Sequence, residues 1–202
     1  MLRLPISIFL IAGLAAPLSA ASDPSSHSIL TVVLDFQGPY SRTVVKEMER
    51  ETATILRSTG VLLDWRIAGE DSPQTEHDLV VMTFAGVCDY GQEPVDRGPG
   101  PLGLTRMADG AMQPFGEVEC DRVVNSVHNA MPHSGYARGN LLIGRAVGRV
   151  VAHELVHMLT KSTEHGADGV ERTALTGAEL ISGYMRLSPF DAARLKQEIP
   201  RP

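Results

Sequence analysis

The sequence predicts a single α+β domain, in which a mixed, twisted sheet lies over a buried helix. Three observations predict this fold class. Residues 29–34 form a continuous apolar run, strand and helix patterns alternate in the segment that follows, and a long apolar helical stretch around residue 153 contains the pattern His-Glu-x-x-His. The whole chain has 202 residues. The part that follows a short leader is long enough for one domain with an adequate core.

The N-terminus has the pattern of an export signal. Arg3 is a minimal positive region, residues 6–18 form a short apolar core, and the small residues Ser19-Ala20 follow. We therefore expect residues 1–20 to be a signal peptide, residues 21–202 to be the domain, and the mature protein to be secreted or periplasmic. The apolar core is too short to span a bilayer, so we expect no stable membrane insertion after cleavage. An uncleaved anchor is the alternative.

The charge balance excludes one class of partner. The chain carries 18 basic and 24 acidic side chains, with a formal net charge of −6. A nucleic-acid-binding protein would call for a basic stripe, so we expect no nucleic acid partner. The sequence also has no internal repeat of the kind that builds solenoids.

Cys88 and Cys120 are the two cysteines of the chain. In an exported protein, an even pair predicts a disulfide first. Two free thiols, or a thiolate bound to a metal, are the alternatives. Neither cysteine is close to His153 in the sequence and there is no Cys-x-x-Cys, which favours the disulfide.

The first half of the chain predicts three strands and a helix. The continuous apolar run at 29–34 is typical of a strand covered on both faces. A helix should then begin at Pro39 or Ser41 and end at Gly60. Apolar and polar residues alternate over 61–67, which predicts a second strand, parallel to the first through a right-handed crossover. Residues 79–84 predict a third strand.

The rest of the chain is punctuated by turn residues. Residues 85–101 are rich in glycine and proline and predict an irregular loop. Two short strands should follow, at 102–106 and 115–120, around Asp109-Gly110. We expect a polar loop from Asn125 to Gly139, which contains His128, His133 and Tyr136. A last helix should have Ser188 as its N-cap and Pro189 at its first position.

The apolar segment around His153-Glu154-Leu155-Val156-His157 predicts a helix that is buried on nearly all sides. Positions i and i+4 of a helix are about 40° apart in projection and roughly 6 Å apart along the axis, so His153 and His157 can share one ion. Glu154 would lie beside the ion, where its carboxylate can reach a water molecule. Gly144 and Gly148 should let this helix approach the sheet closely.

A catalytic zinc site needs a third protein ligand. His165 is the first candidate, provided that the helix ends and the chain folds back; Lys161 suits a helix C-terminus, and Gly166 permits a left-handed turn. Glu179 is the competing ligand, although Thr176-Gly177-Ala178-Glu179 also has the pattern of a capping box, which suffices to explain it. We interpret Glu164, Asp168 and Glu171 as solvated loop charges.

The chain resembles the zincin metallopeptidases, and among them a group of small secreted zinc proteases, through residues 148–157, 163–166 and 169–170. It departs from the metzincin pattern, because Thr160 and Thr163 stand where metzincins have a glycine and their third histidine. Met185 is therefore only a weak candidate for the supporting methionine of that family. The resemblance implies a zincin-like domain, in which one of the two short strands lies at the sheet edge and pairs with extended substrate.

Together these features predict a secreted zinc metallopeptidase that acts on peptides or proteins. One catalytic zinc, held by His153, His157 and His165, would activate water, and Glu154 would act as general base. Tyr184 or Tyr136 could supply a phenol to the oxyanion, but no spacing selects either. A zinc hydrolase of another amide or ester, and a non-catalytic zinc-binding module, are the alternatives.

Overall fold

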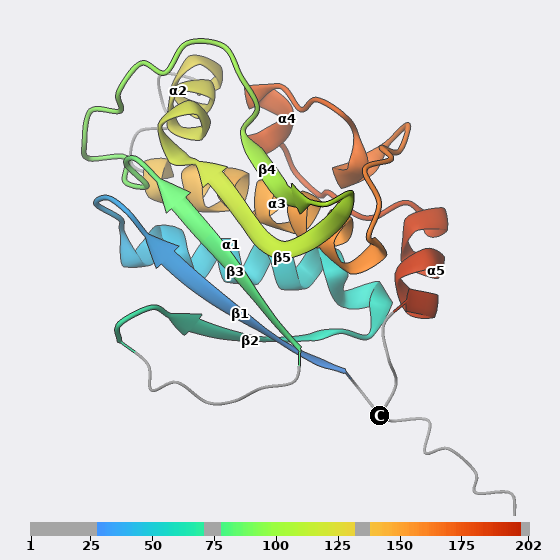
Figure 1. Ribbon diagram of the computed structural model, residues 1–202. Coiled ribbons are helices and arrows are strands. Elements are labelled where there is room, and N and C mark those ends of the chain that lie inside the picture. Colours follow the sequence, from blue (N-terminus) through green and yellow to red (C-terminus); the bar gives the residue numbers. More distant parts are fainter. Residues whose placement is uncertain (1–27, 71–77, 132–137, 199–202) are drawn as a thin grey trace, which may run out of the picture.

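The computed structural model describes residues 28–70, 78–131 and 138–198. These residues form one sheet with helices α1 and α3 behind it (Figure 1). The strands are β1 (Ile29–Phe36), β2 (Leu62–Ile67), β3 (Leu79–Ala85), β4 (Gly103–Ala108) and β5 (Ala111–Glu119). The helices are α1 (Arg42–Leu56), α2 (Cys120–Ala130), α3 (Gly139–Thr160), α4 (Gly177–Ile181) and α5 (Pro189–Glu198), with short 3₁₀ turns η1 (Arg57–Thr59) and η3 (Gly169–Glu171). The predicted signal peptide lies outside the described residues.

The sheet has the strand order β2-β1-β3-β5-β4. β1 pairs in parallel with β2 and β3, and β3 pairs in parallel with β5. β4 is antiparallel to β5 and forms one edge. Asp109 and Gly110 join these two strands with positive φ angles of 51° and 74°, the geometry of a tight hairpin turn. The α+β class with a mixed sheet is therefore confirmed, and so is the parallel connection from β1 to β2.

Among the described residues, helices pack against one face of the sheet (Figure 1). Leu30, Val32 and Leu34 of β1 point to that face and are buried. On the opposite face Ile29 is 58% exposed and Val33 is half-buried. The prediction that β1 is covered on both faces was wrong. An apolar run indicates burial, but it does not indicate what buries each side chain. Thr31, between β2 and β3, is 4% exposed although it points away from the helices.

Helix α1 begins and ends as predicted. Ser41 is its N-cap, and the side chain accepts a hydrogen bond from the amide of Thr43 at 3.3 Å. Val44, Met48 and other residues at helical spacing are buried. The 3₁₀ turn η1 follows, and Gly60 ends it with a left-handed φ of 84°.

Helix α2 replaces part of the predicted loop at 125–139. It runs from Cys120 to Ala130, and Val123, Val124 and Val127 are buried along one side of it. The polar residues of this segment lie on the other side and suggested a loop. The second short strand accordingly ends at Glu119, before Cys120. His133 and Tyr136 lie outside the described residues.

A disulfide between Cys88 and Cys120 ties the loop that precedes β4 to the first residue of α2, as predicted. The neighbouring Asp121 is fully buried. Its carboxylate accepts hydrogen bonds from the amides of Val87 and Val95, at 3.1 and 3.2 Å, and pairs with Arg97. The glycine- and proline-rich loop is thus fixed to α2 at several points before it enters β4.

Helix α3 packs closely against α1. A Cβ at Gly144 would come within 2.7 Å of the Val44 carbonyl oxygen, and one at Gly148 within 2.8 Å of the Met48 carbonyl oxygen. The two glycines therefore permit close contact with α1, and the prediction that they let α3 approach the sheet was wrong. Both helices lie on the same side of the sheet, so α3 packs against the sheet and also against α1 beside it. No helix within the described ranges is long and apolar enough to cross a membrane.

Candidate metal centre

Two imidazoles project together from α3. His153 and His157 are one helical turn apart, and their Nε2 atoms are 2.9 Å from each other. His157 is buried and His153 is half-buried. The helix around them is buried on nearly all sides, as the sequence predicted, so both rings are held by packing.

The chain reverses directly after α3. Lys161 adopts a left-handed conformation with φ of 49°, and its amide donates to the carbonyl of His157. The reversal was predicted, but its left-handed residue was expected at Gly166. Gly166 has no positive φ; its amide instead donates to the carbonyl of Glu171 at 2.9 Å, which closes the loop on itself.

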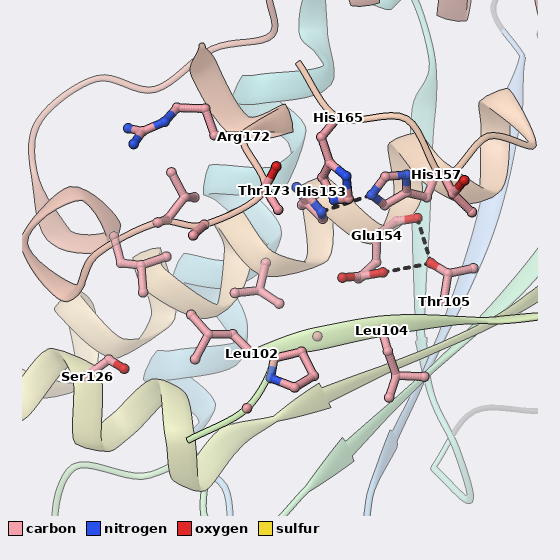
Figure 2. A pocket seen from close by; sticks show the side chains of 18 of the residues that line it. Leu102, Leu104, Thr105, Ser126, His153, Glu154, His157, His165, Arg172 and Thr173 are labelled. Carbon is pink, nitrogen blue, oxygen red and sulfur yellow. Dashed lines mark hydrogen bonds between the residues drawn. The ribbon is translucent and has the colours of Figure 1, made fainter. Parts of the chain in front are cut away.

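The loop 161–171 contacts the metal-binding candidates at three points. It contributes His165, whose ring centroid lies 5.2 Å from that of His153 and 4.8 Å from that of His157. The carbonyl of Ser162 lies 2.7 Å from His157 Nδ1, and the carbonyl of Val170 lies 2.8 Å from His153 Nδ1. Figure 2 shows the three rings gathered at one end of the cleft.

These contacts determine which ring nitrogens are free. A carbonyl oxygen only accepts, so Nδ1 of His153 and of His157 carries the hydrogen in the neutral ring. The lone pairs on the two Nε2 atoms then face each other across 2.9 Å, an arrangement that a cation between them would stabilise. Burial lowers the pKa of His153 to about 4 and also lowers that of His157, which favours the neutral form that binds metals.

The three histidines offer one ligand atom each, and these atoms lie within 4.8 Å of one another. Imidazole nitrogens suit zinc, and three protein ligands leave one tetrahedral position for solvent or substrate. The donor set thus fits a catalytic zinc ion. The geometry brings His153, His157 and His165 together; their role as ligands stays a prediction.

Glu179 is engaged elsewhere. Its carboxylate accepts hydrogen bonds from the amide and hydroxyl of Thr176, at 2.8 and 2.7 Å, and pairs with Arg172. These bonds lower the pKa of Glu179 to about 2. The capping box at the start of α4 is confirmed, and Glu179 is not among the residues of the histidine group.

Glu154 lies beside the histidine group, on the side of the sheet edge. It is 4% exposed, and the hydroxyl of Thr105 on β4 donates to its Oε2 at 2.7 Å (Figure 2). Burial raises the pKa of Glu154 to about 7, although the Thr105 hydrogen bond opposes the shift. A pKa close to neutrality suits a general base, and a bound cation would lower it.

Glu171 is buried, which corrects its interpretation as a solvated loop charge. It is 3% exposed, and its Oε1 has no hydrogen-bond partner among the described residues. Burial, with the charges of Asp191 and Glu154, raises the pKa of Glu171 to about 8. The Glu171 side chain lies against Gly166, where an added Cβ would come within 3.0 Å of the Glu171 Cβ. Glu164 and Asp168 are exposed, as predicted.

A cleft of about 590 Å³ extends from the histidines along β4. Leu102 to Thr105 form one bank, and the segment from Arg172 to Leu175 forms the other (Figure 2). Val150 and Leu180, which are almost completely buried, contribute to the lining between them. β4 is thus the edge strand beside the motif helix, the position that the resemblance implied for one of the two short strands.

The remaining candidates lie elsewhere. His128 is on α2, edge-on to Tyr90, and belongs to neither the histidine group nor the cleft lining. Tyr184 is 77% exposed and does not line the cleft. Met185 is half-buried and packs against the apolar core.

Sequence reasoning missed two residues that organise the site. Thr105 contacts Glu154 from 49 positions away, a separation that no local pattern reveals. Arg149 is fully buried on α3; it pairs with Glu51 at 2.9 Å and donates to the carbonyls of Glu179, Ser182 and Gly183 at the end of α4. A charged residue between valines and glycines of an apolar helix was a signal that Arg149 has buried partners.

Comparison of the sequence with known proteins identifies no family. No family model matches the chain, and no curated protein matches it. One similar solved structure is the crystal structure of archaemetzincin from Methanopyrus kandleri, at 14% identity. The match covers 88% of this chain and 98% of that chain, with a TM-score of 0.45. At that level the function has to be inferred from the side chains of the site itself.

Proposed function

We propose that this protein is a secreted zinc metallopeptidase. The observation that carries the proposal is the convergence of His153, His157 and His165 beside Glu154, at the end of an open cleft. A closed structural zinc site would have a fourth protein ligand and no use for the adjacent carboxylate. Among the described residues, the histidine group contains three ligands only.

A zinc ion held by the three imidazoles would supply a Lewis acid that polarises the scissile carbonyl and activates a water molecule. Glu154 then acts as general base. Its carboxylate accepts a proton from the water and returns it to the leaving amine. The carbonyls of Ser162 and Val170 fix the ring orientation of His157 and His153 and make both imidazoles better donors.

The cleft favours an extended chain as the substrate. It runs beside β4, whose outer edge is unpaired among the described residues. Main-chain groups on such an edge can form hydrogen bonds with a peptide in extended conformation. Leu102, Val150 and Leu175 give the lining apolar surface that a peptide side chain could cover.

The test uses the mature protein, residues 21–202, with metal analysis and a casein or peptide-library assay. We expect one zinc per chain, cleavage that stops on chelation and returns with zinc, and a Glu154→Gln variant that keeps zinc but loses activity at least 100-fold. Cleavage that persists unchanged in the variant would contradict the general-base role. Zinc retention without turnover would indicate a binding module, and turnover of esters or other amides alone would indicate a different zinc hydrolase.

Export is part of the proposal. The disulfide between Cys88 and Cys120 supports it, because structural disulfides are typical of secreted and periplasmic proteins. N-terminal sequencing of the protein recovered outside the cytoplasm should give Ala21 as the first residue. Recovery of the whole chain in the cytoplasm, beginning at Met1, would contradict both the signal peptide and the location.

A further inference from the structure

We propose that Thr105 is a positioning residue, which holds the carboxylate of Glu154 in the orientation needed to accept a proton. This inference rests on the proposed function, since it assigns Glu154 the role of general base. It concerns a contact between the edge strand β4 and helix α3 that no sequence pattern indicates.

The hydroxyl of Thr105 has two acceptors on the same residue. It lies 2.7 Å from Oε2 of Glu154 and 3.3 Å from the backbone oxygen of Glu154. The hydroxyl carries one hydrogen, and the shorter contact to a carboxylate is the stronger hydrogen bond. Thr105 therefore donates to Oε2, and Oε1 accepts no hydrogen bond from the described residues.

The backbone of β4 limits the carboxylate from the other side. A Cβ at Gly103 would come within 2.8 Å of Oε1 and 2.7 Å of Val150 Cγ1, so only glycine lets the strand lie this close to α3. Alternate residues of a strand point to the same side, which places Thr105 and the bare Cα of Gly103 against Glu154. Leu104 points the other way (Figure 2).

These contacts give the two carboxylate oxygens of Glu154 different roles. Oε2 is held by Thr105, and the other oxygen, Oε1, points away from Thr105 toward the cleft (Figure 2), where it can accept the proton of a water molecule. Without the hydroxyl, the carboxylate can rotate about its last side-chain bond, and a smaller fraction of molecules has Oε1 in place. Catalysis depends on such alignment. Among the described residues, the Thr105 hydroxyl contacts Glu154 and none of the three histidines.

The activity test compares Thr105→Val, which has nearly the same shape without the hydroxyl, with Thr105→Ser, which keeps the hydroxyl. We expect Thr105→Val to lower kcat 10- to 100-fold with KM within about twofold and zinc content unchanged. Thr105→Ser should recover most of kcat. Thr54→Val makes the same change on helix α1, where the hydroxyl donates to the carbonyl of Arg50 and does not line the cleft; it is the control and should retain activity. Equal kcat values for Thr105→Val and wild type would overturn the proposal.

A second measurement does not depend on activity. Thr105→Val is made in the wild type and in Glu154→Ala, and urea unfolding of the four metal-free proteins gives their coupling. We expect the unfolding equilibrium constant to rise at least fivefold in the wild-type background and hardly at all beside Glu154→Ala. No coupling would overturn the contact itself. Coupling together with a wild type that cleaves no peptide would leave Thr105 as the holder of Glu154 and contradict only the proposed function.

Discussion

His165 is the residue whose position decides the proposed ligand set. His153 and His157 are separated by one turn of one helix, so the sequence alone could place them together. His165 required the chain to reverse, and Lys161 makes that reversal with a positive φ that sequence reasoning assigned to Gly166. Thr105 could not be predicted, because its contact with Glu154 joins segments that only the sheet brings together.

The ligand set predicts a difference between two substitutions. His165→Ala removes one of three imidazoles and should abolish stoichiometric zinc binding. Glu179→Ala should keep the ion and lower the melting temperature, because it removes the capping box. Metal analysis after dialysis, with thermal unfolding of the same samples, checks both outcomes. Zinc lost from Glu179→Ala and kept by His165→Ala would reverse the assignment.

The buried carboxyl of Glu171 predicts a pH dependence of stability. Its folded pKa of about 8 lies above the ordinary 4.5, so the folded state keeps a proton that the unfolded state releases between these values. The stabilising contribution is complete below pH 4.5 and is lost as the pH rises toward 8. Glu171→Gln should therefore flatten the stability profile of the metal-free protein across this window, and stabilise it by about 1–3 kcal/mol at pH 8.

Urea unfolding at several pH values between 5 and 8 measures this effect. Some slope should remain in Glu171→Gln, because the pKa of Glu154 is raised to about 7 and contributes in the same sense. Glu164→Gln is the control, since the side chain of Glu164 is 81% exposed. Parallel profiles for wild type and Glu171→Gln would show that the carboxyl of Glu171 does not titrate in this range.

Helices and strands whose own residues form a clear hydrophobic or turn pattern were predicted correctly, and helix α2, which has no such pattern, was not. The apolar core of β1, the Ser41 and Gly60 ends of the first helix, and the Asp109-Gly110 hairpin turn all have local physical causes. Helix α2 was missed, because its buried valines are interrupted by polar residues that suit a loop equally well. Its burial comes from contacts with α3 and α4, which a local pattern does not contain.

The contact between α1 and α3 predicts that Gly148 cannot accept a side chain. Alanine is about 1 kcal/mol better than glycine inside a helix, but here its Cβ would come within 2.8 Å of the Met48 carbonyl oxygen. Because the clash involves a backbone atom, it should outweigh the gain in helix propensity. We expect Gly148→Ala to lower the free energy of unfolding by about 1–3 kcal/mol. Gly183→Ala, whose Cβ would meet nothing within 4 Å, should be nearly neutral. Thermal unfolding compares them, and equal melting temperatures would contradict the close contact.

For the whole molecule, the parallel order of the first strands followed from the crossover rule, and the edge position of β4 became clear only in the sheet. The apolar run of β1 did not reveal that, in the part of the chain that the structure describes, helices cover one face of the sheet and not the other. The disulfide between Cys88 and Cys120 joins two segments that are far apart in the sequence and holds the loop that leads into β4 and the cleft. The sequence could predict this pair because the chain has two cysteines.

The disulfide closes a loop of 32 residues, which predicts a large stability effect. Replacing both cysteines by serine should lower the free energy of unfolding by about 3–4 kcal/mol, because the unfolded chain regains the freedom that the link removes. Urea unfolding of the double variant measures the loss, and wild type under reducing conditions is the matched comparison. A loss below about 1 kcal/mol would mean that the hydrogen bonds of Asp121 and Arg122 are enough to keep the loop in place.

The loop 161–171 is attached to all three imidazoles, through its own His165 and through the carbonyls of Ser162 and Val170. In the proposed zinc site, binding of the ion and ordering of this segment would therefore be thermodynamically coupled. At a free zinc concentration of 100 times Kd, mass action alone adds about 2.7 kcal/mol to the folded state. A chain starved of zinc would consequently be the form that proteases of its surroundings remove first, so that scarcity of the ion would limit the amount of the protein as well as its activity.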